Sequence, residues 1–156
     1  MTTPHPPFDS TGGKRQSTVL VIDDEAPIRE NLVRFLRLEG YQVMDAADGA
    51  AGLAAAMQYM PDLILCDVMM PRLTGFEVLA HLQASPAHRH IPLVFLSASA
   101  EPEKLEEGIS MGARSYVTKP FNLATLRQLM ADLLANTPPK QPDANPPSSA
   151  AQGPTT

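Results

Sequence analysis

Residues 60–71 read MPDLILCDVMMP, and within them the apolar run Leu63 to Cys66 leads directly into the carboxylate of Asp67. An uninterrupted apolar run of this length between two prolines, Pro61 and Pro71, is typical of a strand buried on both faces of a sheet. A carboxylate is costly inside such a sheet unless it is paired or hydrated. We therefore expect Asp67 to lie at the exit of the strand and not inside the core.

Strand-like and helix-like segments alternate on both sides of this run. The expected strands are residues 18–22, 41–44, 63–66, 91–96 and 116–118, and the expected helices are residues 28–36, 49–59, 76–83, 103–111 and 123–135. This alternation predicts an α/β fold, a doubly wound five-stranded parallel sheet with five helices on its two faces. Right-handed crossovers bring the loops that follow the strands to one edge of the sheet, where ligands of such folds bind.

Polar side chains follow four of these strands at that edge. Asp23 and Asp24 follow the first strand, Asp67 the third, Ser97 the fourth and Lys119 the fifth. Neighbouring carboxylates repel one another, and a hard divalent cation with oxygen ligands, above all Mg²⁺, relieves that repulsion. Mg²⁺ sites of this kind also take phosphate oxygens, so Asp67 is a candidate nucleophile toward a phosphoryl group, with Lys119 and Ser97 as charge and hydroxyl donors.

Four segments together resemble the receiver domain of two-component response regulators: VLVIDDE at 19–25, DVMMPRLTGFE at 67–77, FLSA at 95–98 and YVTKPF at 116–121. Each motif alone is weak, but their order and spacing are specific. The resemblance covers about Ser17 to Asn136 and implies the flavodoxin-like strand order 2-1-3-4-5.

The resemblance also implies a role for each residue of the acidic edge. Asp67 would be the phosphoacceptor and a Mg²⁺ ligand, Asp24 a direct ligand, and Asp23 a ligand mainly through water. The backbone carbonyl of Met69 would be a further ligand, and Lys119 would contact the phosphoryl group.

Two further residues are implied to form a switch. Ser97 would turn toward the phosphoryl group, and Tyr116 would rotate inward with that movement. The change would alter the face built by the last two helices and the strand between them. Ala98 matches the small residue that the family prefers beside the acceptor site, and Pro120 matches a Lys-Pro step that is often a cis peptide in this family.

Composition narrows the function and the partners. The chain has 156 residues, a net charge of -5 and a hydrophobic content of 44%, which suits one domain without the basic footprint of direct nucleic-acid binding. Cys66 is its single cysteine, so no intrachain disulfide is expected. The N-terminus lacks a signal-peptide core and no run is long enough to span a membrane, so we expect a cytoplasmic protein.

The ends of the chain differ from the middle. Residues 1–16 and 137–156 are rich in proline and small polar residues, and we expect them to be disordered tails on either side of a receiver domain at 17–136. No output domain follows the receiver segment in this sequence, which predicts a stand-alone response regulator. We expect a monomer or a weak, phosphorylation-dependent dimer.

Three function classes remain open. The first is a single-domain response regulator that accepts a phosphoryl group on Asp67 from a histidine kinase or phosphotransfer protein and switches its affinity for a downstream protein. It catalyses its own phosphorylation and is not a stand-alone enzyme. The second is a phosphatase of the haloacid-dehalogenase type, but its D-x-D signature would need a carboxylate where Met69 stands. The third is an adaptor that binds partners without phosphorylation.

Overall fold

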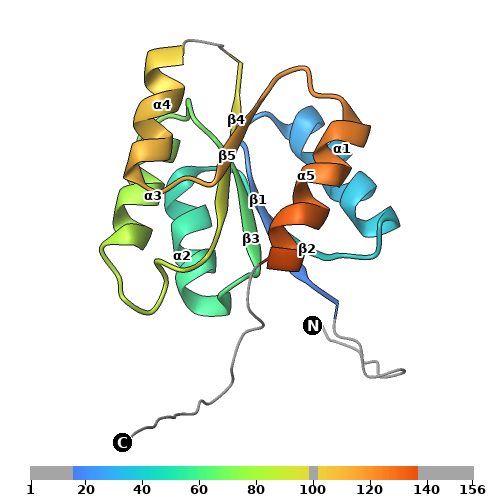
Figure 1. The fold of residues 1–156 in the computed structure, drawn as a ribbon, viewed down its shortest axis with the longest axis horizontal. Coiled ribbons are helices and arrows are strands. Elements are labelled where there is room, and N and C mark those ends of the chain that lie inside the picture. The colour runs from blue at the N-terminus through green and yellow to red at the C-terminus, as the bar shows by residue number, and fades with distance from the viewer. Residues whose placement is uncertain (1–15, 99–101, 137–156) are drawn as a thin grey trace, which may run out of the picture.

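The structure is a computed structural model, and it describes residues 16–98 and 102–136 (Figure 1). The tails expected at residues 1–16 and 137–156 lie outside the described residues, apart from Gln16. The elements, in chain order, are β1 (Thr18–Ile22), α1 (Ala26–Leu38), β2 (Gln42–Ala46), α2 (Gly49–Tyr59), β3 (Leu63–Asp67), α3 (Gly75–Gln83), β4 (Leu93–Ser97), α4 (Pro102–Met111), β5 (Ser115–Thr118) and α5 (Leu123–Asn136).

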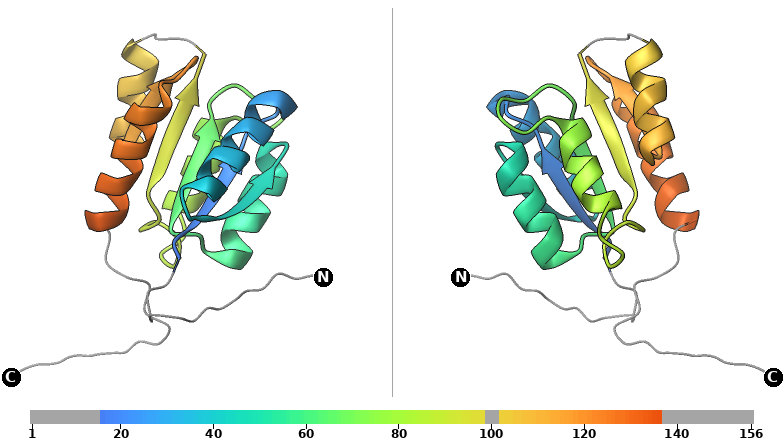
Figure 2. Two further views of the ribbon diagram at one scale, coloured as in Figure 1. Left: turned by 90° about the vertical axis from the view of Figure 1, so that its right-hand side faces the viewer. Right: turned by 90° about the vertical axis from the view of Figure 1, so that its left-hand side faces the viewer.

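The five strands form one parallel sheet with the order β2-β1-β3-β4-β5. This confirms the doubly wound fold that the alternation predicted and the strand order that the resemblance implied. Helices α1 and α5 cover one face of the sheet, and α2, α3 and α4 cover the other (Figures 1 and 2). Among the described residues, none of the helices is long and apolar enough to cross a membrane.

The central strand β3 separates two hydrophobic cores. Leu63 and Leu65 pack into the core under α1 and α5, whereas Ile64 and Cys66 pack into the core under α2 and α3. All four side chains are fully buried, as a strand enclosed on both faces requires. The expectation of a two-sided buried strand at this run is therefore confirmed.

The position of Asp67 differs from the expectation. Asp67 is itself the last residue of β3, paired in register with Leu96 of β4, and only 4% of its surface is exposed. Its place at the exit of the strand is as expected, but the prediction that this carboxylate lies outside the buried interior was wrong. The strand continues one residue further than expected because the ladder to β4 continues through Val68, whose N–H donates to the Leu96 carbonyl at 3.0 Å.

Other element boundaries shift for local reasons. Strand β4 begins at Leu93, two residues later than expected, because Pro92 has no N–H to donate to the ladder. Helix α3 begins at Gly75 because Thr74 and Glu77 form a capping box, in which each side chain accepts a hydrogen bond from the other residue's backbone N–H.

Gly75 brings the start of α3 against the end of the central strand. Its N–H donates to the Val68 carbonyl at 2.8 Å, and a Cβ at this position would clash with the backbone oxygen of Asp67. The same Cβ would lie 3.1 Å from the ring of Phe95. The loop that follows Asp67 is therefore anchored by a contact that only glycine allows.

We expect Gly75→Ala to lower the free energy of unfolding by roughly 1 to 3 kcal/mol, because the added methyl group overpacks this contact. Urea unfolding measures the change. Ala80→Ser, an exposed position on the same helix, serves as the control and should stay within about 0.5 kcal/mol of the wild type. Equal stability of the two variants would contradict the anchoring role of Gly75.

Candidate functional site

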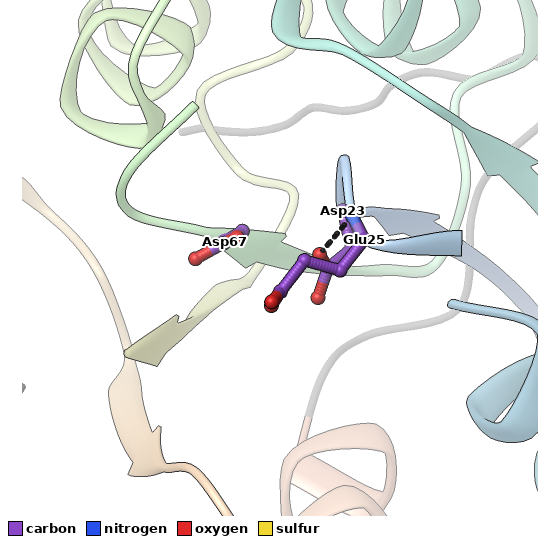
Figure 3. A group of neighbouring side chains, drawn as sticks. All are labelled: Asp23, Glu25 and Asp67. Atoms are coloured by element: carbon purple, nitrogen blue, oxygen red, sulfur yellow. Dashed lines mark hydrogen bonds between the residues drawn. The ribbon is translucent and has the colours of Figure 1, made fainter. Parts of the chain in front are cut away.

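The carboxyl edge of the sheet gathers three carboxylates around one ammonium group. Lys119 Nζ lies 3.0 Å from Asp23 Oδ2, 2.9 Å from Glu25 Oε1 and 3.3 Å from Asp67 Oδ2. The side chain of Lys119 is only 9% exposed, so these ion pairs are largely shielded from solvent. Figure 3 shows Asp23 and Glu25 just after β1 and Asp67 at the neighbouring end of β3.

Asp23 follows β1 directly and is fully buried. Its Oδ1 accepts a hydrogen bond from the Glu25 N–H at 2.9 Å, and its backbone carbonyl accepts one from Arg29 Nη1 at 2.8 Å. Its Oδ2 forms an ion pair with Lys119. Among the described residues, no donor gives this oxygen a hydrogen bond of good geometry. A buried acceptor without a hydrogen bond is unusual, and it leaves a coordination position available.

Backbone hydrogen bonds hold the neighbouring strand ends together. The Lys119 N–H donates to the Ser97 carbonyl at 2.7 Å, and Ser97 ends β4 in register with Thr118 of β5. Ser97 is buried, as is Asp67 on the next strand. The sheet register therefore brings residues from three separate βα units to one site.

Burial and charge alter the acidity of the central carboxylate. Desolvation and the nearby charge of Asp23 raise the pKa of Asp67 to about 6, with a smaller contribution from Asp24, although Lys119 acts in the opposite direction. Burial also lowers the pKa of Lys119, but the carboxylates of Glu25, Asp23 and Asp67 outweigh burial and hold that pKa above its ordinary value. At neutral pH the site therefore combines an ionised aspartate, whose charge is disfavoured by burial and by Asp23, with a charged lysine.

The donor set fits a Mg²⁺ ion. Asp23, Glu25 and Asp67 each offer one carboxylate oxygen, and these oxygens lie within 4.8 Å of one another. All the donors are hard oxygens, and the Oδ2 of Asp23 is a buried acceptor without a hydrogen bond among the described residues. Oxygen-only sites with a few carboxylates are those that Mg²⁺ prefers.

The structure brings together Asp23, Asp67 and Lys119, with Ser97 buried on the adjacent strand end. The Asp24 side chain is exposed, and its carboxylate is not among the three that converge, although its charge contributes to the raised pKa of Asp67.

The remaining predicted residues lie around the edge of the site. Met69 follows Asp67 on the β3–α3 loop with its side chain 64% exposed, and Tyr116 lies on β5 with 42% of its surface exposed. The Lys119–Pro120 peptide is cis, as the resemblance implied.

Glu25, which makes the shortest contact to Lys119, was not among the residues predicted from the sequence. The signal was present, because Glu25 directly follows the acidic pair in VLVIDDE. Its partner is 94 residues away in sequence, so only the fold reveals the pairing.

A buried aspartate at the end of the central strand, a neighbouring lysine and a cation-binding set of carboxylates define a doubly wound α/β protein with an acidic site at its switch-point edge. A family model described as the response regulator receiver domain matches residues 19–131. The chain belongs to this family, the receiver domains of two-component response regulators, which confirms the resemblance.

Solved structures of similar chains agree with this assignment. The chemotaxis response regulator CheY4 of Vibrio cholerae superimposes with a TM-score of 0.72 at 35% identity, covering 76% of this chain and 99% of that one. A putative response regulator from Chloroflexus aurantiacus gives a TM-score of 0.74 at 30% identity, covering 78% of this chain and 100% of that one.

Curated relatives are longer proteins. The phosphate regulon transcriptional regulatory protein PhoB of Pseudomonas aeruginosa is 35% identical over 127 residues, which are 81% of this chain and 56% of that protein. Histidine kinase P4 of Formosa agariphila is 32% identical over 123 residues, 79% of this chain and 9% of the kinase. The chain therefore spans about half the length of the regulator and a small part of the kinase.

Family membership sets the general chemistry. Receiver domains are signalling proteins rather than metabolic enzymes; they bind Mg²⁺ at an acidic pocket and interact with histidine kinases and phosphotransfer proteins. This chain has an acidic cluster of Asp23, Glu25 and Asp67 at the carboxyl edge of its sheet.

We expect Asp67→Asn to stabilise the metal-free protein at pH 7.5 by about 1 to 2 kcal/mol. The native pKa of about 6 lies above the reference value of 3.8, so the native state favours the protonated form. The stability of the wild type therefore falls as the pH rises from about 4 to about 6, and the gain from Asp67→Asn is full above about pH 6 and disappears below pH 4, where both states are protonated.

Urea unfolding in a chelator between pH 4 and pH 8 measures this difference. Glu106→Gln, which removes one exposed charge on α4, is the matched control and should change stability little at any pH. A pH-independent difference between Asp67→Asn and the wild type would contradict the assigned pKa direction.

Proposed function

We propose that this chain accepts a phosphoryl group on Asp67 from a histidine kinase or a phosphotransfer protein and then changes its affinity for a downstream protein. The observation that best supports this function is the position of Asp67, a buried carboxylate at the end of β3 with Lys119 Nζ 3.3 Å away. Its raised pKa marks a carboxylate held in an unfavourable charged state, which is common at functional sites.

In the proposed transfer, one carboxylate oxygen of Asp67 attacks the phosphorus of a phosphohistidine. The new P–O bond forms as the P–N bond breaks, and the electron pair returns to the donor's imidazole, which leaves as the neutral base after taking up a proton. Lys119 offers its positive charge to the phosphoryl oxygens. Mg²⁺ would be held by Asp23 and Asp67, with Asp24 and the Met69 carbonyl as the further ligands that the family resemblance implies, and it would supply further charge neutralisation at these oxygens.

The proposed response begins at the neighbouring strand. Ser97 ends β4 beside Asp67 and is bonded through its carbonyl to the Lys119 N–H on the β5 side. Turning the Ser97 hydroxyl toward the phosphoryl group would leave space that the half-exposed ring of Tyr116 on β5 can occupy. The movements of Ser97 and Tyr116 would thus convert a change of charge at Asp67 into a change of shape at the protein surface.

The proposed output face consists of α4, β5 and α5. Three large apolar side chains, Ile109, Tyr116 and Leu123, are exposed there, one on each element. Exposed apolar groups on an otherwise polar surface favour protein contact. The acidic net charge of -5 favours a protein partner over direct contact with nucleic acid. We further propose that self-association is at most weak and depends on phosphorylation.

Incubation of the wild type with acetyl phosphate and Mg²⁺ should give a single phosphoryl adduct by intact mass. The adduct should disappear in Asp67→Asn and with a chelator, because the nucleophile or the charge neutralisation is then lost. Asp132→Asn on α5 should behave as the wild type. An undiminished adduct in Asp67→Asn, or no adduct with either acetyl phosphate or a phosphohistidine donor, would refute the proposal.

Ser97→Ala should still accept the phosphoryl group, but it should lose the accompanying change at Tyr116, since the hydroxyl that turns is absent. The chain has only three tyrosines, so ring NMR signals of labelled tyrosine can be assigned with a Tyr116→Phe variant. An identical shift of the Tyr116 signal in the wild type and in phosphorylated Ser97→Ala would contradict the coupling of the two residues.

A further inference from the structure

Glu25 occupies the N-cap position of α1, yet its side chain caps nothing. The preferred N-cap residues are Ser, Thr, Asp and Asn, and three other helices use them. Asp48 accepts a hydrogen bond from the Ala51 N–H at the start of α2, Thr74 caps α3, and the Asn122 side chain accepts bonds from backbone N–H groups in the first turn of α5. The capping position of α1 is thus occupied by an acid that serves another contact.

That contact is Lys119. Glu25 Oε1 lies 2.9 Å from Lys119 Nζ, closer than either Asp23 or Asp67, and it links the start of α1 to the end of β5. The side chain of Glu25 is 55% exposed, whereas that of Lys119 is 9% exposed. Glu25 therefore lies on the solvent side of the lysine, and the two aspartates lie on the buried side.

The backbone of Glu25 contributes to the same arrangement. Its N–H donates to Asp23 Oδ1 at 2.9 Å and fixes the orientation of that carboxylate (Figure 3). The side chain and the main chain of Glu25 thus contact two different members of the site. Substitution by glutamine keeps the main-chain bond and the shape of the side chain, and it removes only the charge.

We propose that Glu25 is a positioning residue that holds Lys119 in the unphosphorylated site and yields it to the phosphoryl group during transfer. This inference rests on the proposed function of Asp67 as phosphoacceptor. The Lys119 ammonium has three protons to donate, and in the resting site three carboxylates already surround it. A phosphoryl group on Asp67 needs at least one of these donors, and the exposed Glu25 is the partner most easily exchanged for water.

Glu25 has two opposing effects in this arrangement. Its charge lies within 4.8 Å of the Asp23 and Asp67 oxygens, so it strengthens the attraction for a divalent cation. The same charge binds the lysine that the phosphoryl group needs and repels an anionic phosphodonor. Glu25 should therefore favour Mg²⁺ binding and slow phosphoryl uptake.

The test compares the wild type, Glu25→Gln and Glu30→Gln. Glu30 is exposed on α1, and its substitution removes the same charge without touching Lys119. Calorimetric titration of the unphosphorylated protein with Mg²⁺ gives the dissociation constant. Intact mass against time with acetyl phosphate at saturating Mg²⁺ gives the rate of uptake.

Glu25→Gln should weaken Mg²⁺ binding by roughly 5-fold, as expected for one lost charge at this range in a partly solvated site, and Glu30→Gln by less than about 2-fold. At saturating Mg²⁺, Glu25→Gln should take up the phosphoryl group roughly 2- to 5-fold faster than the wild type, because Lys119 is released. Changes in opposite directions distinguish positioning from simple damage to the loop, which would reduce both binding and uptake.

The inference is overturned if Glu25→Gln matches Glu30→Gln in both measurements. It is also overturned if the uptake rate at saturating Mg²⁺ stays the same or falls. A wild type that takes up no phosphoryl group from any donor would instead refute the proposed function. The two failures are therefore distinguishable within one set of experiments.

Discussion

The acidic edge depends on one ammonium group placed among three carboxylates. Like charges held this close oppose folding, and Lys119 offsets much of that repulsion in the metal-free protein. The compensation is incomplete, since the pKa of Asp67 remains raised by burial and by its acidic neighbours. A site of this kind has an affinity for additional positive charge because its own lysine does not fully balance it. Stability is therefore lower than it would be with neutral groups, as is common where a protein maintains a reactive centre.

Much of the fold follows from local patterns. Helix α2 has the bounds that its alanine-rich stretch predicted, and the buried run of β3 identified the centre of the sheet. The predicted ends of helices and strands were wrong where contacts between distant parts of the chain determine them. Strand β2 was expected to end before Asp45, but at the edge of the sheet this side chain reaches out to Arg29 at 2.9 Å and the strand continues. In the centre of a sheet a charged residue usually ends the strand. At the edge its side chain can reach a partner outside the sheet, so the strand can continue past it.

Most residues of the site could be predicted from the sequence because the arrangement of the strands could be predicted. Asp23, Asp67, Ser97 and Lys119 each follow or end a strand, and parallel strands place such residues at one edge. The enclosure of Asp67 was not predictable, because it results from Asp23 and Lys119, which belong to other βα units. The contact of Glu25 was missed for the same reason. Its position suggests a helix cap, and only the three-dimensional arrangement shows that it serves the lysine instead.

The absence of a side chain at Gly75 has a further consequence for the direction in which a signal travels. The backbone beyond Asp67 is pressed against the first turn of α3, with no room to shift toward that helix. Ser97 and Lys119, on the opposite side of Asp67, are connected to β5 and to the half-exposed Tyr116. The backbone around Asp67 is therefore tightly packed on the side of α3. If Asp67 takes up a phosphoryl group as proposed, the added bulk and charge would be accommodated away from α3, toward Ser97, Lys119 and β5, so the missing side chain at Gly75 would make the response one-sided.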